Sequence, residues 1–518
     1  MRLPSRSQLC SAAGRLLVVL LSATSLFAAG WPQYRGPNHD GVSHDRIRTE
    51  WTGSLTNPVW RILLTNSLSS LTVAEGRVFT QTRRWVGGTS MEVCVALDAA
   101  TGEEVWDQPV DRANYPNGGV GFDDGPRTTP VVEGESVYVL GSYLKLSRLE
   151  AATGEVVWTK DLGALYGSAI IPWQNAASPL LDEGRIYLNV SAQTDSLMAL
   201  RTSDGSLLWR FHQEQLTHST PVLATIHGVR QLIFATQSGL VSLIPETGQL
   251  LWKHAYSFRY QSSLAVSPVV HEDMVFISGA HAYGMGSMTI QATFQEGSWS
   301  TAQLWATNNP ASHWMTPVCH EGFLYGQFGI QSFDSIRAQL KCVDMRTGTV
   351  RWSTNGFGRG GTLLVGGHLV VLVETNHLVL AEASPEAYRQ LGRFQAFPYW
   401  HGSTNKCWNS PAVCEGRLYA RSTSYVACFD LSMPKLSLAP PRPSQPGRLQ
   451  LSARTESGAP VSADRLPGVE LRAADDPSEP LEQWLLLTNL PVLQNGELLF
   501  QEVETGPSPR YFILRETE

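Results

Sequence analysis

The hydrophobic positions of this chain follow one pattern that returns several times along its length. In residues 93–106, alternating apolar residues run as far as Leu97, a polar turn carries Thr101 and Gly102, and a second short run ends at Trp106. This alternation predicts two antiparallel strands joined by a tight hairpin. The same pattern recurs at residues 149–158, 200–209, 243–252 and 343–352.

Further strands are predicted between these hairpins, each introduced by Ser-Pro or Thr-Pro. Examples are residues 129–132 with 136–139, and residues 178–181 with 185–188. A hairpin cannot bury its apolar face alone, so regularly spaced units must stack on their neighbours. Four strands per unit, with a hydrophobic inner strand and an outer strand closed by Trp, predict one blade of a β-propeller.

An aromatic residue marks each outer strand, and consecutive aromatics are 42 to 53 residues apart. The eight positions are Trp60, Trp106, Trp158, Trp209, Trp252, Trp305, Trp352 and Phe394. The last unit, residues 410–431, has inner strands but no Trp after it, and residues 58–63 can supply its missing outer strand. We therefore predict an all-β fold, an eight-bladed β-propeller closed by an N-terminal strand, with a small C-terminal β module.

The repeated unit Ala-x-Asp-x-x-Thr-Gly-x-x-x-Trp resembles the tryptophan-docking motif of the pyrroloquinoline-quinone (PQQ) repeat propellers. That superfamily includes the quinoprotein alcohol dehydrogenases and the propeller lipoprotein of the outer-membrane β-barrel assembly machine. The resemblance implies that each Trp packs on the turn of the adjacent blade. Residues 31–43, 356–360 and 383–386 also resemble a non-dehydrogenase branch, the exported PQQ-like repeat proteins of planctomycetes and verrucomicrobia.

The first 30 residues have the features of a secretion signal. Three arginines precede the apolar run at residues 16–21, and small residues at 28–30 offer a cleavage site. That run is too short to span a membrane, and Cys10 lies before it, so no lipobox is present. The mature protein is expected to be periplasmic or secreted, monomeric and without a membrane span.

Composition divides the remaining chain into four segments. A leader occupies residues 31–57, the propeller residues 58–432, a Pro-rich linker residues 433–447 and a small β domain residues 448–518. The last domain is a candidate for sorting, packing or surface binding. The net charge is −7, so the chain lacks the excess of basic residues typical of nucleic-acid binding, and nucleic acid is not an expected partner.

Six cysteines follow the signal segment, and most of them occupy predicted strand positions. We interpret them as small buried hydrophobic residues. Cys407 lies just outside a strand and is the candidate for a reactive thiol. No Cys-x-x-Cys pair occurs and the histidines are scattered, so no metal site is assigned.

The candidate binding site follows from the geometry of a propeller. Its innermost strands line a central channel, so the residues just before each Ser/Thr-Pro meet at one mouth. These residues are Arg127, Trp173, Asn175, His218, His313, Trp314, Arg359, Lys406 and Trp408, accompanied by Asp124, Gln174, Gln261 and Asn409. Aromatic faces mixed with cations are typical of a pocket for a planar or anionic ligand. The alternative is that these side chains cap strands and hold channel water.

Two functions remain in view. The first is an exported, non-catalytic scaffold that binds a protein or small ligand at its channel mouth or rim, with a role in cell-envelope assembly. The alternative, implied by the resemblance, is an alcohol or sugar dehydrogenase that uses PQQ and calcium. Such an enzyme needs an aromatic floor, carboxylate and amide ligands for Ca²⁺ and an Asp base, and Asp123 with Asp124 is as easily explained as a solvated turn. Neither adjacent cysteines nor a Cys-x-x-Cys-His haem motif is present.

Overall fold

A computed structural model describes residues 30–51, 57–64, 66–115, 124–256, 264–279, 286–329, 338–398, 405–456, 458, 460–504 and 511–516. The predicted signal segment and Gln261 lie outside these residues. Within the described part the chain is almost entirely β, with one short α-helix, α1 (Leu162–Tyr166), and the 3₁₀ turns η5 (Ala463–Gly468) and η6 (Leu481–Gln483). The all-β prediction is therefore confirmed.

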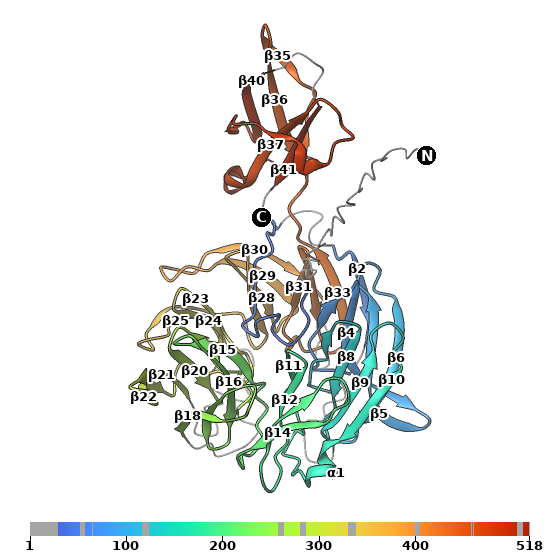
Figure 1. Cartoon of the computed structure of the whole chain (residues 1–518), viewed down its shortest axis with the longest axis vertical. Coiled ribbons are helices and arrows are strands. Elements are labelled where there is room, and N and C mark those ends of the chain that lie inside the picture. The colour runs from blue at the N-terminus through green and yellow to red at the C-terminus, as the bar shows by residue number, and fades with distance from the viewer. Residues whose placement is uncertain are drawn as a thin grey trace, which may run out of the picture.

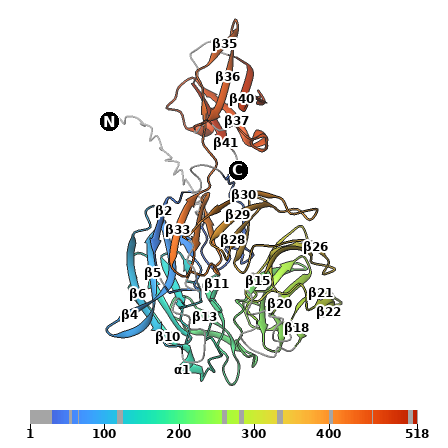
Figure 2. The same ribbon diagram turned by 180° about the vertical axis from the view of Figure 1, so that it is seen from behind.

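Residues 60–430 form eight sheets in the described part of the chain, and these follow one another around a centre (Figures 1 and 2). The first contains β3 (Thr72–Ala74), β4 (Arg77–Val86), β5 (Thr89–Asp98) and β6 (Glu104–Arg112); the second β7 (Val131–Glu133), β8 (Ser136–Leu140), β9 (Lys145–Glu150) and β10 (Val156–Asp161); the third β11 (Leu180–Asp182), β12 (Arg185–Asn189), β13 (Leu197–Arg201) and β14 (Leu207–Phe211); and the fourth β15 (Val222–Ile226), β16 (Val229–Thr236), β17 (Gly239–Leu243) and β18 (Leu250–Ala255).

The second half of the series repeats this arrangement. The fifth sheet contains β19 (Val269–His271), β20 (Met274–Ser278), β21 (Ser287–Gln295) and β22 (Ser298–Thr307); the sixth β23 (Val318–His320), β24 (Phe323–Phe328), β25 (Gln339–Asp344) and β26 (Val350–Thr354); the seventh β27 (Gly361–Val365), β28 (His368–Val373), β29 (His377–Glu382) and β30 (Gln390–Gln395); and the eighth β31 (Ala412–Cys414), β32 (Arg417–Arg421) and β33 (Tyr425–Asp430). Strand β1 (Val42–Ser43) adds to the seventh sheet, parallel to β27.

The outer strand of the eighth sheet comes from the other end of the chain. Strand β2 (Trp60–Leu63) pairs antiparallel with β33, with Trp60 opposite Cys428 and Leu63 opposite Tyr425. The middle strands of the sheets are buried on both faces, as residues 93–97 show in β5, because neighbouring sheets pack face to face.

The indoles of the outer strands lie on the turns of the following sheets. Six Nε1 groups donate to a backbone carbonyl there: Trp60 to Ala99, Trp106 to Ala151, Trp158 to Thr202, Trp209 to Pro245, Trp305 to Met345 and Trp352 to Ser384. Gly102, with φ of +77°, leaves room for the Trp60 ring, because a Cβ there would lie 2.6 Å from it.

Trp252 and Phe394 depart from this arrangement. The Nε1 of Trp252 donates instead to Oε1 of Gln231 in its own sheet, at 2.7 Å. The next sheet offers no Thr-Gly turn, since β21 and β22 continue to a tip at Glu296 and Gly297. Phe394 has no N–H to donate, and its ring packs on that of Phe429, with centroids 5.1 Å apart.

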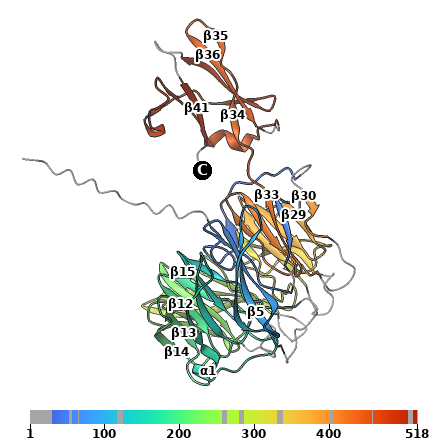
Figure 3. The same cartoon turned by 90° about the vertical axis from the view of Figure 1, so that its right-hand side faces the viewer.

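The C-terminal module contains two small sheets and stands apart from the eight-sheet body (Figure 3). One sheet contains β34 (Leu436–Leu438), β35 (Arg442–Gln445), β36 (Arg448–Thr455), β39 (Val492–Gln494) and β40 (Glu497–Glu504), and the other β37 (Val469–Ala474), β38 (Leu485–Leu486) and β41 (Tyr511–Glu516). Strands β34 and β35 fall within the predicted linker, so regular structure begins earlier than residue 448. Pro443 is tolerated because β35 pairs with β36 alone, as an edge strand.

Candidate functional site

The leader crosses the end of the channel at which the innermost strands finish. Trp31 exchanges backbone hydrogen bonds with Val73 of the first sheet, and Pro32 O accepts the N–H of Val132 in the second. On another side, the N–H of Leu364 in the seventh sheet donates to Gly41 O. One segment therefore bridges sheets that lie far apart around the ring.

Arg35 fixes the middle of the leader to the sixth sheet. Its guanidinium is 3% exposed and donates to the carbonyls of Thr316 and Pro317, both at 2.8 Å, and to Asp40 O at 2.7 Å. Burial lowers the pKa of Arg35, and three carbonyl acceptors compensate for that burial. Neighbouring Tyr34 lines the cavity described below.

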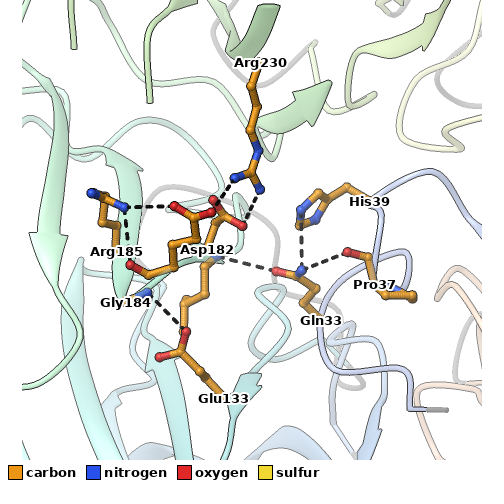
Figure 4. A network of polar contacts seen from close by, with 10 residues as sticks. Gln33, Pro37, His39, Glu133, Asp182, Gly184, Arg185 and Arg230 are labelled. Atoms are coloured by element: carbon orange, nitrogen blue, oxygen red, sulfur yellow. Dashed lines mark hydrogen bonds and ion pairs between the residues drawn. The ribbon is translucent and has the colours of Figure 1, made fainter. Parts of the chain in front are cut away.

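Figure 4 shows how the leader meets the second to fourth sheets. Gln33 donates to Pro37 O at 3.3 Å and lies 3.4 Å from Nε2 of His39. Burial and the nearby Arg230 lower the pKa of His39 to about 3, so this imidazole is neutral at physiological pH. Arg230 pairs with Asp182 and Glu183, which ties the third and fourth sheets together.

A collar of hydroxyl groups links neighbouring sheets where the innermost strands begin. We use the name "collar" for Ser70, Ser178, Thr220 and Ser410. Thr129 N donates to Ser178 Oγ at 2.9 Å, Ser178 N to Thr220 Oγ1 at 3.0 Å, and Ser410 N to Ser70 Oγ at 3.0 Å. These hydroxyl groups at the start of the innermost strands therefore connect neighbouring sheets.

A cavity of about 230 Å³ is lined in part by the residues of the collar. Its lining contains Tyr34, Leu68, Ser70, Asp124, Arg127, Trp173, Ala176, Ser178, His218, Thr220, Ala265, His313, Trp314, Trp408 and Ser410. The structure thus brings six of the nine predicted site residues to one cavity: Arg127, Trp173, His218, His313, Trp314 and Trp408. Lys406 and Arg359 lie against these residues.

Asp124 holds two of the cations at the cavity wall. Lys406 Nζ is 2.9 Å from Asp124 Oδ1, although 282 residues separate them, and Arg127 Nη2 is 3.7 Å from Oδ2. Arg127 also donates to Trp173 O at 3.3 Å. Arg359 is a third cation here, so the described residues place three cations beside two carboxylates, Asp124 and Glu374.

Two tryptophans form an aromatic wall beside these cations. The ring centroids of Trp314 and Trp408 are 4.7 Å apart, and the guanidinium of Arg359 lies 4.8 Å and 5.6 Å from them. Glu374 fixes this arrangement, because it accepts from Trp408 Nε1 at 2.8 Å and from Arg359 N at 2.9 Å. The rings and the guanidinium therefore form one cation–π stack.

The loop that carries Trp173 has an unusual backbone. Trp173 and Gln174 adopt φ values of +61° and +56°, a left-handed conformation that costs a non-glycine residue on the order of 1–3 kcal/mol. Gln174 N donates to Ile171 O at 3.0 Å, and Asn175 N donates to Ser142 O at 3.1 Å. These bonds hold Trp173, 40% exposed, at the mouth.

His218 is a buried, neutral donor beneath this loop. Its Nε2 lies 2.7 Å from Gln174 O, and since a carbonyl only accepts, Nε2 carries the proton. Burial, followed by the charge of Arg127, lowers the pKa of His218 to about 3. It therefore orients the loop and does not titrate near neutral pH.

Two predicted residues belong elsewhere. Asn175 is fully buried, and its side chain bonds the backbone of Ala177 rather than facing the mouth cavity, as is usual for an Asx turn. Cys407 is also fully buried, its thiol contacts Asn376 Oδ1 at 2.9 Å, and burial raises its pKa. The interpretation of Cys407 as a reactive thiol is therefore wrong.

Several residues of the site were missed by the sequence reasoning, among them Tyr34 and Glu374. Tyr34 reaches the cavity through the leader, and its Trp-Pro-Gln-Tyr-Arg-Gly context was the available signal. Glu374 follows the second strand of the seventh sheet, and no local motif marks it. Within the described residues, no group of three His, Cys, Asp or Glu side chains is placed to hold a metal ion, and no helix is long and apolar enough to cross a membrane.

Sequential antiparallel sheets around a channel, joined by indoles that dock on the turns of neighbouring sheets, define a β-propeller of PQQ-like repeats. Residues 90–354 match the protein family described as outer membrane protein assembly factor BamB. The chain belongs to this family.

Relatives confirm the match over part of its length. The factor BamB of Salmonella typhimurium is 31% identical over 141 residues, 27% of this chain and 32% of that protein. The factor of Moranella endobia is 24% identical over 263 residues, 49% of this chain and 63% of that protein. The chain therefore spans about a third of the first relative and under two thirds of the second.

Among solved structures, the quinohemoprotein alcohol dehydrogenase of Comamonas testosteroni shares the fold. It has a TM-score of 0.53 at 12% identity, over 82% of this chain and 83% of that one. At this identity the likeness concerns the fold alone.

Proposed function

We propose that this protein is an exported, non-catalytic propeller of eight blades, closed by β2, that binds a ligand at its channel mouth and serves in cell-envelope assembly. Support for the closed ring comes from the pairing of β2 with β33 and from the bond between Ser410 and Ser70. The envelope role is supported by the family to which the chain belongs.

The observation that carries the binding function is the abundance of hydrogen-bond donors in the mouth cavity. Ser70, Ser178 and Thr220 each accept an N–H from the backbone, and a hydroxyl that accepts keeps its own proton to donate. Within the described residues, Trp314 Nε1 is buried and makes no hydrogen bond. Together with Arg127 and its neighbouring cations, these groups favour a ligand that accepts hydrogen bonds and carries negative charge.

The aromatic wall adds a preference for shape. Trp314, Trp408 and Trp173 offer flat apolar faces beside the cations. A ligand that combines a ring with a carboxylate satisfies both features, because the ring stacks and the carboxylate accepts. We therefore assign a small planar carboxylate to the cavity.

The alternative, a dehydrogenase with PQQ and calcium, fits this cavity poorly. Calcium requires several carboxylate or amide oxygens, whereas Asp124 is the one carboxylate in the described lining and already faces Arg127 and Lys406. The same ion pairs leave Asp124 badly suited to act as a base. The donor set therefore favours binding without catalysis.

The test uses benzoate, a planar anion, and benzyl alcohol, its neutral counterpart, with binding followed by tryptophan fluorescence. Benzoate is expected to bind with a saturable signal that benzyl alcohol does not produce. Arg127→Met is expected to weaken benzoate binding at least tenfold, whereas Arg185→Met, on the opposite end of the third sheet, leaves it unchanged. Equal binding of the two probes, or no benzoate signal, contradicts the assignment.

The envelope role has its own test. The protein carrying a photo-crosslinker at Trp85, 78% exposed at the tip of the β4–β5 hairpin, is expected to form a defined adduct with an outer-membrane assembly protein. A crosslinker at Leu165, also exposed, provides the control. No adduct at Trp85, or the same adducts at Trp85 and Leu165, in intact cells contradicts a specific role in assembly.

A further inference from the structure

Two buried carboxylates lie side by side in the first sheet, outside the mouth cavity. Glu92 in β5 and Asp111 in β6 are register partners, and they are 0% and 5% exposed. In the described part of the chain, neither forms a salt bridge. Two like charges side by side are unstable in a buried site, so the pair favours holding a proton.

One turn of the second sheet holds both carboxylates. Ser142 donates its N–H at 2.9 Å and its hydroxyl to Glu92, and Tyr143 N donates to Asp111 Oδ2 at 2.9 Å. Gly141 begins this turn because a Cβ there would lie 2.2 Å from Asp111 Oδ2. The hydroxyl of Tyr115 completes the shell of Glu92 at 2.7 Å.

Four cations surround the pair. Arg83 is the register partner of Glu92 in β4, Arg112 and Lys145 act on Asp111, and Arg83 and Arg127 also act on Tyr115. Burial, followed by the charge of Asp111, raises the pKa of Glu92 to about 7, and burial raises that of Asp111. The proton occupancy of the pair therefore changes near neutral pH.

The same turn is joined to the loop at the cavity mouth. Ser142 donates to Glu92, and its carbonyl accepts the N–H of Asn175 at 3.1 Å. Asn175 directly follows Trp173 and Gln174, whose left-handed backbone depends on such bonds. The carbonyls of these two residues hold Arg127 and His218. The buried acid pair and the cavity thus share one support.

We propose that proton uptake by the Glu92–Asp111 pair sets the position of the Trp173 loop and thereby the affinity of the mouth cavity for an anion. The affinity part rests on the proposed binding function. The protonated pair removes the mutual repulsion beneath the turn and removes negative charge behind the cavity, so both effects favour anion binding at lower pH.

The loop itself is tested without any ligand, by ¹⁹F NMR of the full mature chain labelled with 5-fluorotryptophan. Trp173→Phe assigns the Trp173 signal. This signal is expected to shift with a midpoint near pH 7, to lose that transition in Glu92→Gln and to keep it in Glu104→Gln, an exposed carboxylate of the same sheet. The Trp85 signal serves as an internal control that does not titrate.

A second variant keeps the test decisive if Glu92→Gln fails to fold. In Asp111→Asn, Glu92 loses its charged neighbour, and the Trp173 midpoint is expected to move to lower pH. A Trp173 signal that does not titrate in the wild type, or that titrates identically in all variants, overturns the proposal.

Benzoate binding separates this inference from the proposed function. Affinity is expected to be about fivefold or more higher at pH 6 than at pH 8, with the ratio falling towards one in Asp111→Asn. Equal benzoate affinity at both pH values overturns the proton coupling and leaves the binding function intact. If benzoate binds at neither pH while Trp173 titrates, the binding function fails and the coupling to the loop stands.

Discussion

Ser410 donates its backbone N–H to the hydroxyl of Ser70 at 3.0 Å, although 340 residues separate the two in the sequence. This bond joins the innermost strands of the eighth and first sheets. Both residues also line the mouth cavity, so the contact that brings the two ends of the repeat together also shapes the site.

Ser70→Ala is expected to destabilise the protein by about 0.5–1.5 kcal/mol, because the partly buried Ser410 N–H loses its acceptor. Ser298→Ala, on the exposed strand β22, provides a matched control and is expected to change stability by less than about 0.5 kcal/mol. Urea unfolding measures both. Equal stability of the two variants contradicts a structural role for the collar.

Gly102→Ala and Gly76→Ala separate backbone strain from contact with the indole. Both glycines have positive φ, +77° and +69°, but a Cβ at 102 meets the Trp60 ring, whereas a Cβ at 76 meets nothing within 4 Å. Each substitution is expected to cost about 1 kcal/mol for conformation, and Gly102→Ala about 1–3 kcal/mol more for overpacking. Thermal unfolding of the two variants under identical conditions measures this difference. Equal melting temperatures would contradict the inference that Gly102 makes room for the Trp60 ring.

Glu92→Gln is expected to change how stability depends on pH. The pKa of Glu92 is raised in the folded state to about 7 from an ordinary value of 4.5, so the folded protein binds this proton more tightly than the unfolded chain. The contribution of Glu92 to the free energy of unfolding is therefore fully present below about pH 4.5, falls between pH 4.5 and 7, and is lost above that range. The wild type minus variant difference is expected to fall by about 3 kcal/mol across this window. A difference that is flat with pH argues against a raised pKa.

Cys407 is expected to resist alkylation in the native protein. It is fully buried, so the reagent cannot reach it. Its pKa is also raised, so little of the reactive thiolate forms. Cys414, which is partly exposed, is the internal comparison and should react first. Peptide mapping after iodoacetamide treatment, with and without denaturant, checks the order. Labelling of Cys407 before Cys414 in the folded state would show that its environment opens.

The sequence was informative where a local pattern repeats. The Ser/Thr-Pro step predicted the position of the mouth, because it lies at the same point of the repeats that carry it, and Arg127 and Trp408 both line the cavity there. Asn175 has the same sequence position but turns inward, because its amide closes a local turn. Sequence spacing reports which backbone positions are equivalent, and it does not report the direction of a side chain.

Features that depend on contacts between sheets gave no sequence signal. Glu374 supports Trp408 from the seventh sheet, and Glu92 meets Ser142 from the second. In the sequence, Trp252 is indistinguishable from the other outer-strand tryptophans. Its indole bonds Gln231 because the hairpin of the next sheet, β21–β22, is longer. In each case the decisive neighbour belongs to a different part of the chain.

The contacts of the leader determine when it can fold relative to the sheets. Its anchoring carbonyls at Thr316 and Pro317, and its partner Leu364, belong to sheets made long after the leader has been synthesised. Arg35 therefore lacks its hydrogen-bond acceptors until most of the ring has folded. The leader residues are therefore among the last of the described residues to reach their native places, and their contacts form only when the ring is nearly complete.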